Sequence, residues 1–192
     1  LFGESVLPNG RDGIVVVSSE ASIIGGDGPG NTIGGNEEIG VRIDGGSENR
    51  VTGNFIGTNR DGADLSNNGD GIRIGGSSQN RIGEPGEGNA NTIGFTNGDA
   101  AIRITGGGAS NNKVQNNFIG VDRRGGAMQN ASLGVFIEGG GAGTLTGNVI
   151  GGVNEGEGNS IAHSVSSGIA VVGANALSNT FHGNRIYSNG FL

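Results

Sequence analysis

The chain repeats a short pattern in which a small residue precedes two aliphatic residues that stand two positions apart. The copies begin at residues 13, 40, 71, 101, 134 and 168, so successive copies start 27 to 34 residues apart. A spacing of two positions is the period of a β-strand, whereas a helix brings every third or fourth residue to one face. The pattern therefore predicts one short strand of the same kind in every repeat.

A second pattern, Asn-x-apolar, occurs twice in most repeats and predicts two further short strands. Three short strands in a repeat of about 30 residues form one coil of a parallel β-helix, and parallel crossovers are right-handed. We therefore expect an all-β fold, a right-handed single-stranded parallel β-helix of about six coils over residues 13–192. Residues 1–12 are predicted to form a strand-like segment before it, a possible contact between subunits.

The Asn of the second pattern shares its strand parity with the apolar residue, so both side chains are predicted to point inward. An inward Asn at a corner can bond the backbone of its own turn and the equivalent Asn of the next coil. In the first pattern, Ile43, Ile74, Ile104 and Ile137 are predicted to stack on one another. The expected structural asparagines are Asn54, Asn80, Asn91, Asn117, Asn148, Asn159 and Asn184.

Composition narrows the function classes. The chain has 44 Gly and 24 Asn among 192 residues, 3 Pro and no Cys. Without a Gly-x-y period or abundant Pro it is not collagen, and without Cys it is not a disulfide scaffold. The periodic aliphatic residues exclude general disorder, and no apolar run is long enough to cross a membrane. A net charge of −7 disfavours a nucleic-acid binder, so neither nucleic acid nor membrane is expected as a partner.

Two outward rows of basic side chains are the candidate ligand-binding surface. The middle residue of the first pattern is basic in three consecutive repeats, and so is the middle residue of the second. Such a row can recognise an acidic polymer through guanidinium forks, or it can pair with neighbouring carboxylates as a solvated face, and the second interpretation is favoured. The rows consist of Arg42, Arg73 and Arg103, and of Arg50, Arg81 and Lys113.

The sequence motifs for catalysis or metal binding give weaker evidence of a site than the two basic rows do. Asp61, Asp64 and Asp70 share one Gly-containing loop and could hold Ca²⁺, but their spacing does not match an EF-hand, so a solvated loop is favoured and no cofactor is expected. His163 and His182 have no partner at a catalytic or metal-binding spacing. We expect a protein that is not an enzyme.

The segments Gly53-Asn54-Phe55-Ile56-Gly57-Thr58, Asn117-Phe118-Ile119-Gly120-Val121-Asp122 and Gly147-Asn148-Val149-Ile150-Gly151 resemble a known repeat. It is the right-handed parallel β-helix repeat of large secreted or surface bacterial proteins, which share the pectate-lyase-like architecture. The resemblance spans roughly residues 13–190 and implies a location outside the cell or on its surface. That superfamily includes pectate lyases, polygalacturonases, adhesins and repeat modules, and fold alone does not choose among these activities.

Both ends of the chain are apolar and show no cap, with Leu1 and Phe2 at one end and Phe191 and Leu192 at the other. We expect either a piece of a longer array or ends that stack head to tail on other copies of the chain. The sequence thus predicts a structural β-helix that assembles into a filament. The alternative is an acidic-polysaccharide-binding module, or a polysaccharide lyase or hydrolase, that uses the outward arginines.

Overall fold

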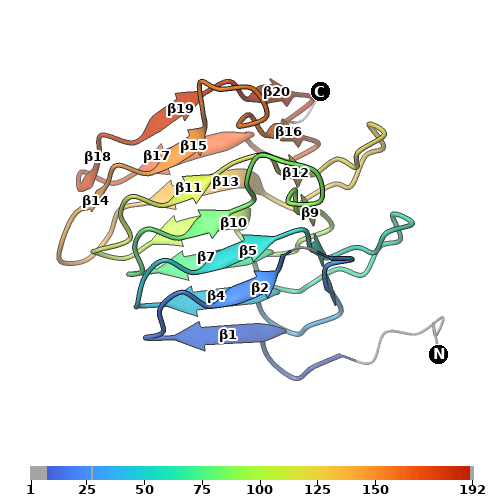
Figure 1. Cartoon of the computed structure of the whole chain (residues 1–192), viewed down its shortest axis with the longest axis horizontal. Coiled ribbons are helices and arrows are strands. Elements are labelled where there is room, and N and C mark those ends of the chain that lie inside the picture. The colour runs from blue at the N-terminus through green and yellow to red at the C-terminus, as the bar shows by residue number, and fades with distance from the viewer. Residues whose placement is uncertain (1–7, 27, 191–192) are drawn as a thin grey trace.

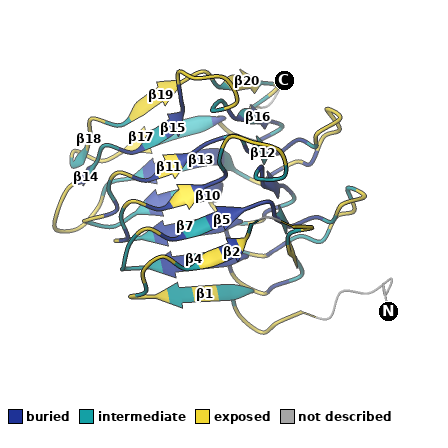
Figure 2. Cartoon of the chain, in the orientation of Figure 1, coloured by how far each residue is buried: buried dark blue, intermediate teal, exposed yellow. Residues whose placement is uncertain are grey.

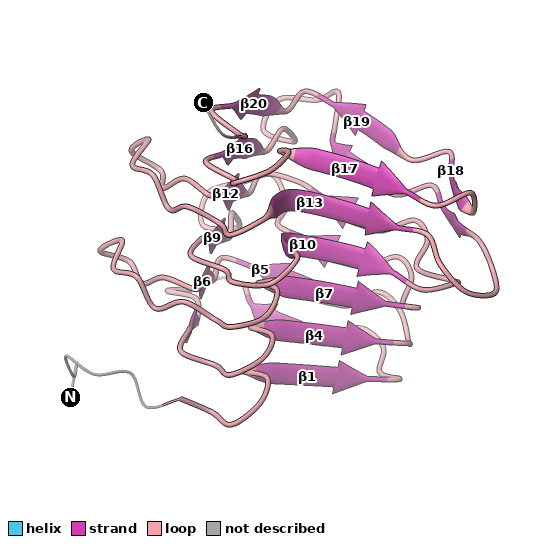
Figure 3. Cartoon of the chain, turned by 180° about the vertical axis from the view of Figure 1, so that it is seen from behind, coloured by secondary structure: helices cyan, strands magenta, loops and turns pink. Residues whose placement is uncertain are grey.

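The computed structural model describes residues 8–26 and 28–190 and shows an all-β parallel solenoid (Figure 1). Strands and loops make up this described part, which contains no helix (Figure 3) and therefore none that is long and apolar enough to span a bilayer. Residues 8–12 are not in a strand. Leu1, Phe2, Phe191 and Leu192, together with residues 3–7 of the predicted N-terminal segment, lie outside the described residues.

The first sheet contains one strand from each copy of the first sequence pattern. Its register pairs Ile43 with Ile74, Ile74 with Ile104, and Ile104 with Ile137, so the predicted aliphatic column is confirmed. All four side chains are fully buried. The six parallel strands are, in order, β1 (Ile14–Val17), β4 (Val41–Asp44), β7 (Ile72–Gly75), β10 (Ala100–Thr105), β13 (Leu133–Glu138) and β17 (Ile169–Val172).

The second and third sheets come from the Asn-x-apolar pattern and also have six parallel strands each. The second sheet contains β2 (Ile23–Gly25), β5 (Arg50–Thr52), β8 (Arg81–Ile82), β11 (Lys113–Val114), β15 (Val149–Gly151) and β19 (Thr180–His182). The third contains β3 (Thr32–Ile33), β6 (Phe55–Ile56), β9 (Thr92–Ile93), β12 (Phe118–Ile119), β16 (Ser160–Ala162) and β20 (Arg185–Tyr187). The sequence analysis did not foresee a further pair, β14 (Leu145–Thr146) and β18 (Ala176–Leu177), near the C-terminal end.

The core is the space between the three sheets, where the inward-facing aliphatic residues of the strands meet. Ile82, Ile93 and Ile104 illustrate one coil, because each comes from a different sheet and each is fully buried. Burying one such side chain contributes about 1.5–3 kcal/mol. Strands of two or three residues are too short to be stable alone, so their stability comes from this stacking. Figure 2 shows burial concentrated in the middle coils and exposure rising at the last coil.

Two hairpin loops project from the same side of the solenoid (Figures 1 and 3). The first hairpin (residues 58–64) follows β6 and the second hairpin (residues 121–127) follows β12, and an antiparallel bridge closes each one. Gly57 and Gly120 stand at their bases with φ of 73° and 70°. A Cβ at Gly57 would collide with the carbonyl oxygen of Gly94, and one at Gly120 with that of Ala162, so both corners require glycine.

Candidate functional site

Each strand of the second sheet after β2 is preceded by an Asn whose side chain bonds the coils together. The backbone N–H and the Nδ2 of Asn80 both donate to Oδ1 of Asn112, at 2.9 and 2.7 Å. The residue before the Asn is in the left-handed region, as Gln79 is with φ of 57°, and this bend turns the Asn inward. The members of this ladder are Asn49, Asn80, Asn112, Asn148 and Asn179.

A second ladder precedes the strands of the third sheet in the same way. Asn117 lies within it: its Oδ1 accepts from Nδ2 of Asn91 at 2.9 Å, and its own Nδ2 donates to Oδ1 of Asn159 at 2.9 Å. The same Nδ2 also donates to the carbonyl oxygens of Ile82 and Gln115, at 2.7 and 2.9 Å. The predicted hydrogen-bonded ladder is therefore confirmed, and its members here are Asn31, Asn54, Asn91, Asn117, Asn159 and Asn184.

A third ladder, which the sequence analysis missed, follows the strands of the third sheet. Nδ2 of Asn36 donates to Oδ1 of Asn67 at 2.7 Å, and further along Oγ1 of Thr96 donates to Oδ1 of Asn130 at 3.0 Å. Thr96 and Ser164 replace Asn in two coils, so no single residue type marks this column. The sequence does contain a clue to this column. Asn67 and Asn130 are 63 residues apart, the same interval that separates β6 and β12, the strands that precede the two hairpins.

The first basic row lies in register on the outer face of the first sheet, where Arg42, Arg73 and Arg103 pair as neighbours. Nε of Arg42 lies 2.9 Å from Oδ2 of Asp12, whose side chain is almost fully buried. Arg73 forms no ion pair with any residue that the structure describes.

Arg103 is the most heavily paired member of this row. It donates to Oε2 of Glu138 from Nε at 3.1 Å and from Nη2 at 2.5 Å, and to Oδ2 of Asp99 from Nη1 at 2.6 Å. Its guanidinium also lies over the ring of Phe136. Burial alone lowers the pKa of Arg103, but the hydrogen bond to Glu138 and the surrounding carboxylates outweigh this, so its pKa is raised.

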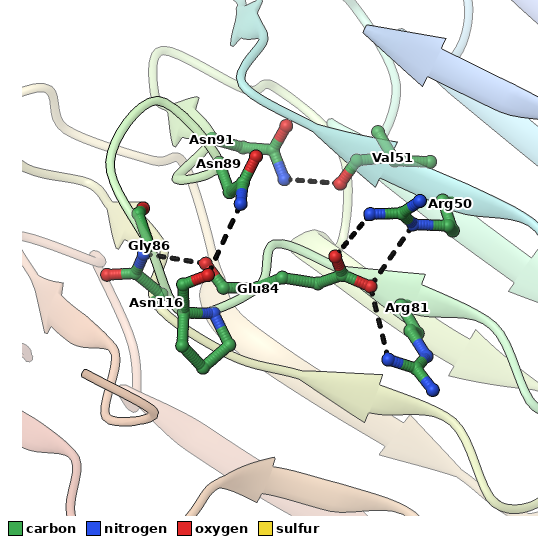
Figure 4. A network of polar contacts seen from close by, with 9 residues as sticks. Arg50, Val51, Arg81, Glu84, Gly86, Asn89, Asn91 and Asn116 are labelled. Carbon is green, nitrogen blue, oxygen red and sulfur yellow. Dashed lines mark hydrogen bonds and ion pairs between the residues drawn. The ribbon is translucent and has the colours of Figure 1, made fainter. Parts of the chain in front are cut away.

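The second basic row runs along the second sheet, where Arg50 pairs with Arg81 and Arg81 with Lys113. Glu84 connects two of its members, as Figure 4 shows. Its carboxylate accepts from Nε and Nη2 of Arg50 at 3.2 and 2.5 Å, and from Nη1 of Arg81 at 3.3 Å. Nδ2 of Asn116 donates to the backbone carbonyl of Glu84 at 2.7 Å and thereby holds this loop in place. Four of the six predicted ligand-binding side chains are thus directed at carboxylates of the chain itself.

The candidate calcium ligands are not gathered into one site. Asp61 is exposed, Asp64 accepts from the backbone N–H of Ser66, and Asp70 is buried and accepts from the backbone N–H of Ala100 at 3.0 Å. Burial raises the pKa of Asp70, and the bond from Ala100 and the charge of Arg103 offset only part of this. Over residues 8–26 and 28–190, no three His, Cys, Asp or Glu side chains lie close enough together to hold a metal ion.

The two histidines come from different sheets, because His163 follows β16 and His182 ends β19. His163 occupies a left-handed corner with φ of 54° before Ser164, and its ring meets that of Tyr187 edge-on at 6.2 Å between centroids. His182 ends β19 in the last coil and is exposed. Neither is hydrogen-bonded through its ring to a described residue, so neither shows the partner that a catalytic imidazole uses.

A groove between the two hairpins contains basic residues that the sequence analysis did not single out. Arg60 lies over the ring of Phe55, with 6.0 Å from Cζ to the centroid, and Arg123 lies over Phe118 at 5.7 Å. Both arginines line the groove together with Arg124, and none of the three forms an ion pair with a described residue. The signal was present as Phe-Ile-Gly with an Arg three residues after the Gly, which occurs twice, 63 residues apart.

Comparisons of the chain with models of known protein families, with curated proteins and with solved structures find no match. The architecture of the solenoid and the arrangement of its side chains therefore carry the functional argument.

Proposed function

We propose that this chain is a non-enzymatic structural β-helix that stacks head to tail with copies of itself into a filament outside the cell. The observation that carries the proposal is the direction of the asparagine ladders. In every Asn–Asn pair the earlier coil donates and the later coil accepts, as Asn148 does toward Asn179 at 2.9 Å. A column of this kind has an acceptor end and a donor end, and the two are complementary.

The end coils carry the chemistry that this stacking needs. In the last coil, Nδ2 of Asn179 is buried without a hydrogen-bond partner among the described residues, whereas its equivalents in the four earlier coils all donate to the next Asn. The column of Asn179 begins in the first coil at Ser22, whose hydroxyl oxygen can accept a hydrogen bond. In the second ladder, no described residue donates to Oδ1 of Asn31. A buried donor without a partner costs about 1–3 kcal/mol, which an acceptor on the first coil of a second copy would remove.

Apolar surface is complementary at the same two ends. Val171, Phe181 and Ile186 occupy inward-facing positions of the last described coil, yet they are 42%, 39% and 49% exposed because no described residue covers them. The first coil has a hollow lined by residues that include Ile14 and Ile24. Among the described residues, one edge of each three-sheet end has no paired strand. A contact between unlike ends that does not close on itself produces a filament.

The location outside the cell rests on the resemblance of the repeats to those of secreted and surface bacterial proteins, whereas the proposed right-handed winding rests on the handedness of parallel crossovers. The pectate-lyase-like superfamily also includes enzymes and polysaccharide-binding modules, which are the alternative. We favour the structural role because Arg42, Arg50, Arg81 and Arg103 already have carboxylate partners. A carboxylate partner competes with an acidic polymer for the same guanidinium group.

The experiment compares three purified chains by size-exclusion chromatography with light scattering and by negative-stain electron microscopy. The unmodified chain is expected to form rods that lengthen with concentration. Ile186→Asp places a charge on the apolar end face and is expected to abolish the lengthening, whereas Val153→Asp, at a side chain that is 82% exposed on the side of the solenoid, leaves it intact. Short rods of one chain length at every concentration, or equal assembly by Ile186→Asp, would contradict the proposal.

A separate experiment tests the alternative. Binding of acidic and neutral polysaccharides is measured with and without Ca²⁺, with Glu84→Gln as the informative variant. Removing this carboxylate frees Arg50 and Arg81, so binding that appears only in the variant shows that the basic row is neutralised in the native protein. Binding by the unmodified chain that Arg73→Gln removes would instead favour the alternative function.

A further inference from the structure

We propose that the groove between the two hairpins is a lateral self-association site, and that it binds the acidic loop formed by residues 83–88 of a second copy of this chain. The surface lies along the third sheet, and its edge at Gly28 and Pro29 adjoins the hollow of the first coil. This inference goes beyond the filament contact and does not depend on it.

The groove gathers three arginines within an acidic protein. Arg60, Arg123 and Arg124 line it and have no ion pair with a described residue. Two carboxylates, Asp61 and Asp122, also line it. Oδ1 of Asp122 is already committed to its own hairpin, because it accepts from the backbone N–H groups of Arg124 and Gly126 at 2.7 Å each.

The two principal arginines are held in equivalent positions before any ligand arrives. Each guanidinium lies over the phenylalanine five residues before it. Each also donates to a backbone carbonyl of the preceding coil, Arg60 to Pro29 at 3.5 Å and Arg123 to Ala90 at 3.3 Å. A guanidinium that is held in this way loses less side-chain entropy when a carboxylate binds.

The same chain supplies a matching negative loop. Residues 83–88 connect β8 to β9 and contain two glutamates. Glu84 is paired with Arg50 and Arg81, but Glu87 is exposed and forms no ion pair with a described residue. Pro85 and the three glycines of this loop have small side chains or none. Glu87 can therefore face a neighbouring molecule without a bulky side chain from these residues beside it.

Topology places the loop and the groove so that two copies fit one another. The hairpins leave β6 and β12, whereas the acidic loop enters β9, which lies between those two strands in the third sheet. The hairpins are thus two strand spacings apart, about 9.5 Å, with the acidic loop at the height midway between them. The hairpins and the acidic loop lie at opposite ends of these third-sheet strands, which are only two residues long. A twofold axis parallel to the rod therefore brings each acidic loop opposite the partner's groove, between its two hairpins.

This arrangement gives a lateral dimer of parallel rods with the same contact made twice. Glu87 of each copy faces Arg60 and Arg123 of the other. Because the rods are parallel, lateral pairing is compatible with head-to-tail stacking and would join filaments side by side. The contact is charged and lies at the surface, so salt screening weakens it.

The test uses the Ile186→Asp background, in which end stacking is removed and only lateral association remains. Sedimentation equilibrium at low salt is expected to show a monomer–dimer equilibrium that shifts toward monomer as salt rises. Arg123→Glu and Glu87→Lys are each expected to weaken the dimer by at least about ten-fold. Glu38→Lys makes the same charge change at an exposed site elsewhere and should leave the dimer unchanged.

The decisive measurement is a mixture. Arg123→Glu and Glu87→Lys chains each self-associate poorly. Together they form one native contact and one contact in which both substituted charges are reversed beside the unchanged Arg60, so the mixture is expected to form a heterodimer that is tighter than either variant's own dimer. Circular dichroism melting checks that all variants are folded. A chain that is monomeric at low salt, variants that dimerise normally, or a mixture that stays monomeric would each overturn the proposal. If the Ile186→Asp chain dimerises while the unmodified chain fails to form filaments, the stacking proposal alone is wrong.

Discussion

Replacing Asn117 by Leu tests whether the ladders stabilise the fold or merely accompany it. The side chain is buried and takes part in four hydrogen bonds, with Asn91, Asn159, Ile82 and Gln115. Leu has a similar size but neither donates nor accepts. The substitution therefore removes a rung from the ladder while leaving the aliphatic core unchanged.

The magnitude follows from two opposing contributions. Four hydrogen bonds at about 1 kcal/mol each amount to about 4 kcal/mol of lost stability. A buried Leu side chain returns about 2 kcal/mol of hydrophobic stabilisation. The expected net decrease in the free energy of unfolding is about 2 kcal/mol. For a chain of this length that corresponds to a Tm lower by about 4–8 °C.

The assay is urea and thermal unfolding followed by far-ultraviolet circular dichroism, in the Ile186→Asp background at high salt, so that neither proposed association contributes to stability. Asn97→Leu is the matched control, because Asn97 is exposed and its side chain has no hydrogen bond to a described residue. The control should change the free energy of unfolding by no more than about 0.5 kcal/mol. A Tm of Asn117→Leu equal to or above that of the parent chain would refute the argument that inward asparagines stabilise the coils.

Three further substitutions give independent checks by the same unfolding assay. Gly120→Ala forces a Cβ against the carbonyl oxygen of the next coil at a φ of 70° and should cost about 2 kcal/mol or more, whereas Gly140→Ala, which meets nothing within 4 Å, should be near neutral. Burial raises the pKa of Asp70, so the native state binds this proton more tightly than the unfolded state, and the native protein loses stability as pH rises above 3.8 through the raised pKa. Asp70→Asn should therefore gain stability relative to the native protein between pH 4 and pH 7, and a relative loss over that range would show that the sign is wrong. Glu84→Gln should cost about 1 kcal/mol, since its two arginine partners are largely exposed, and raising the salt concentration should reduce the difference.

The architecture could be predicted because strand parity and repeat spacing are properties of the sequence itself. Ile74 stands two positions from Ile72 in a segment that recurs every 30 residues or so, and stacking follows from that alone. The inward position of Asn117 followed from the same parity, since it stands two residues before Ile119. Both arguments need only local geometry and repetition.

Contacts across coils could not be predicted in the same way. Glu84 is 34 residues from Arg50, and their pairing depends on the path of the loop after β8, which no periodicity specifies. Arg60 and Arg123 face one groove only because their hairpins project from the same side two coils apart. The third ladder was missed because Thr96 and Ser164 perform the role of Asn in two of its coils.

The recurrence of both hairpins at a 63-residue interval has a consequence for how such a molecule can change in length. The natural unit is two coils, one with a tight second corner and a hairpin, the next with a long Gly-rich corner and no hairpin. Inserting or deleting one whole unit preserves every ladder, every aliphatic column and the alternation of loops, while inserting a single coil places two like loops side by side. Chains built in this way are therefore expected to differ from one another by whole two-coil units, each of which changes the length of the rod by about 9.5 Å.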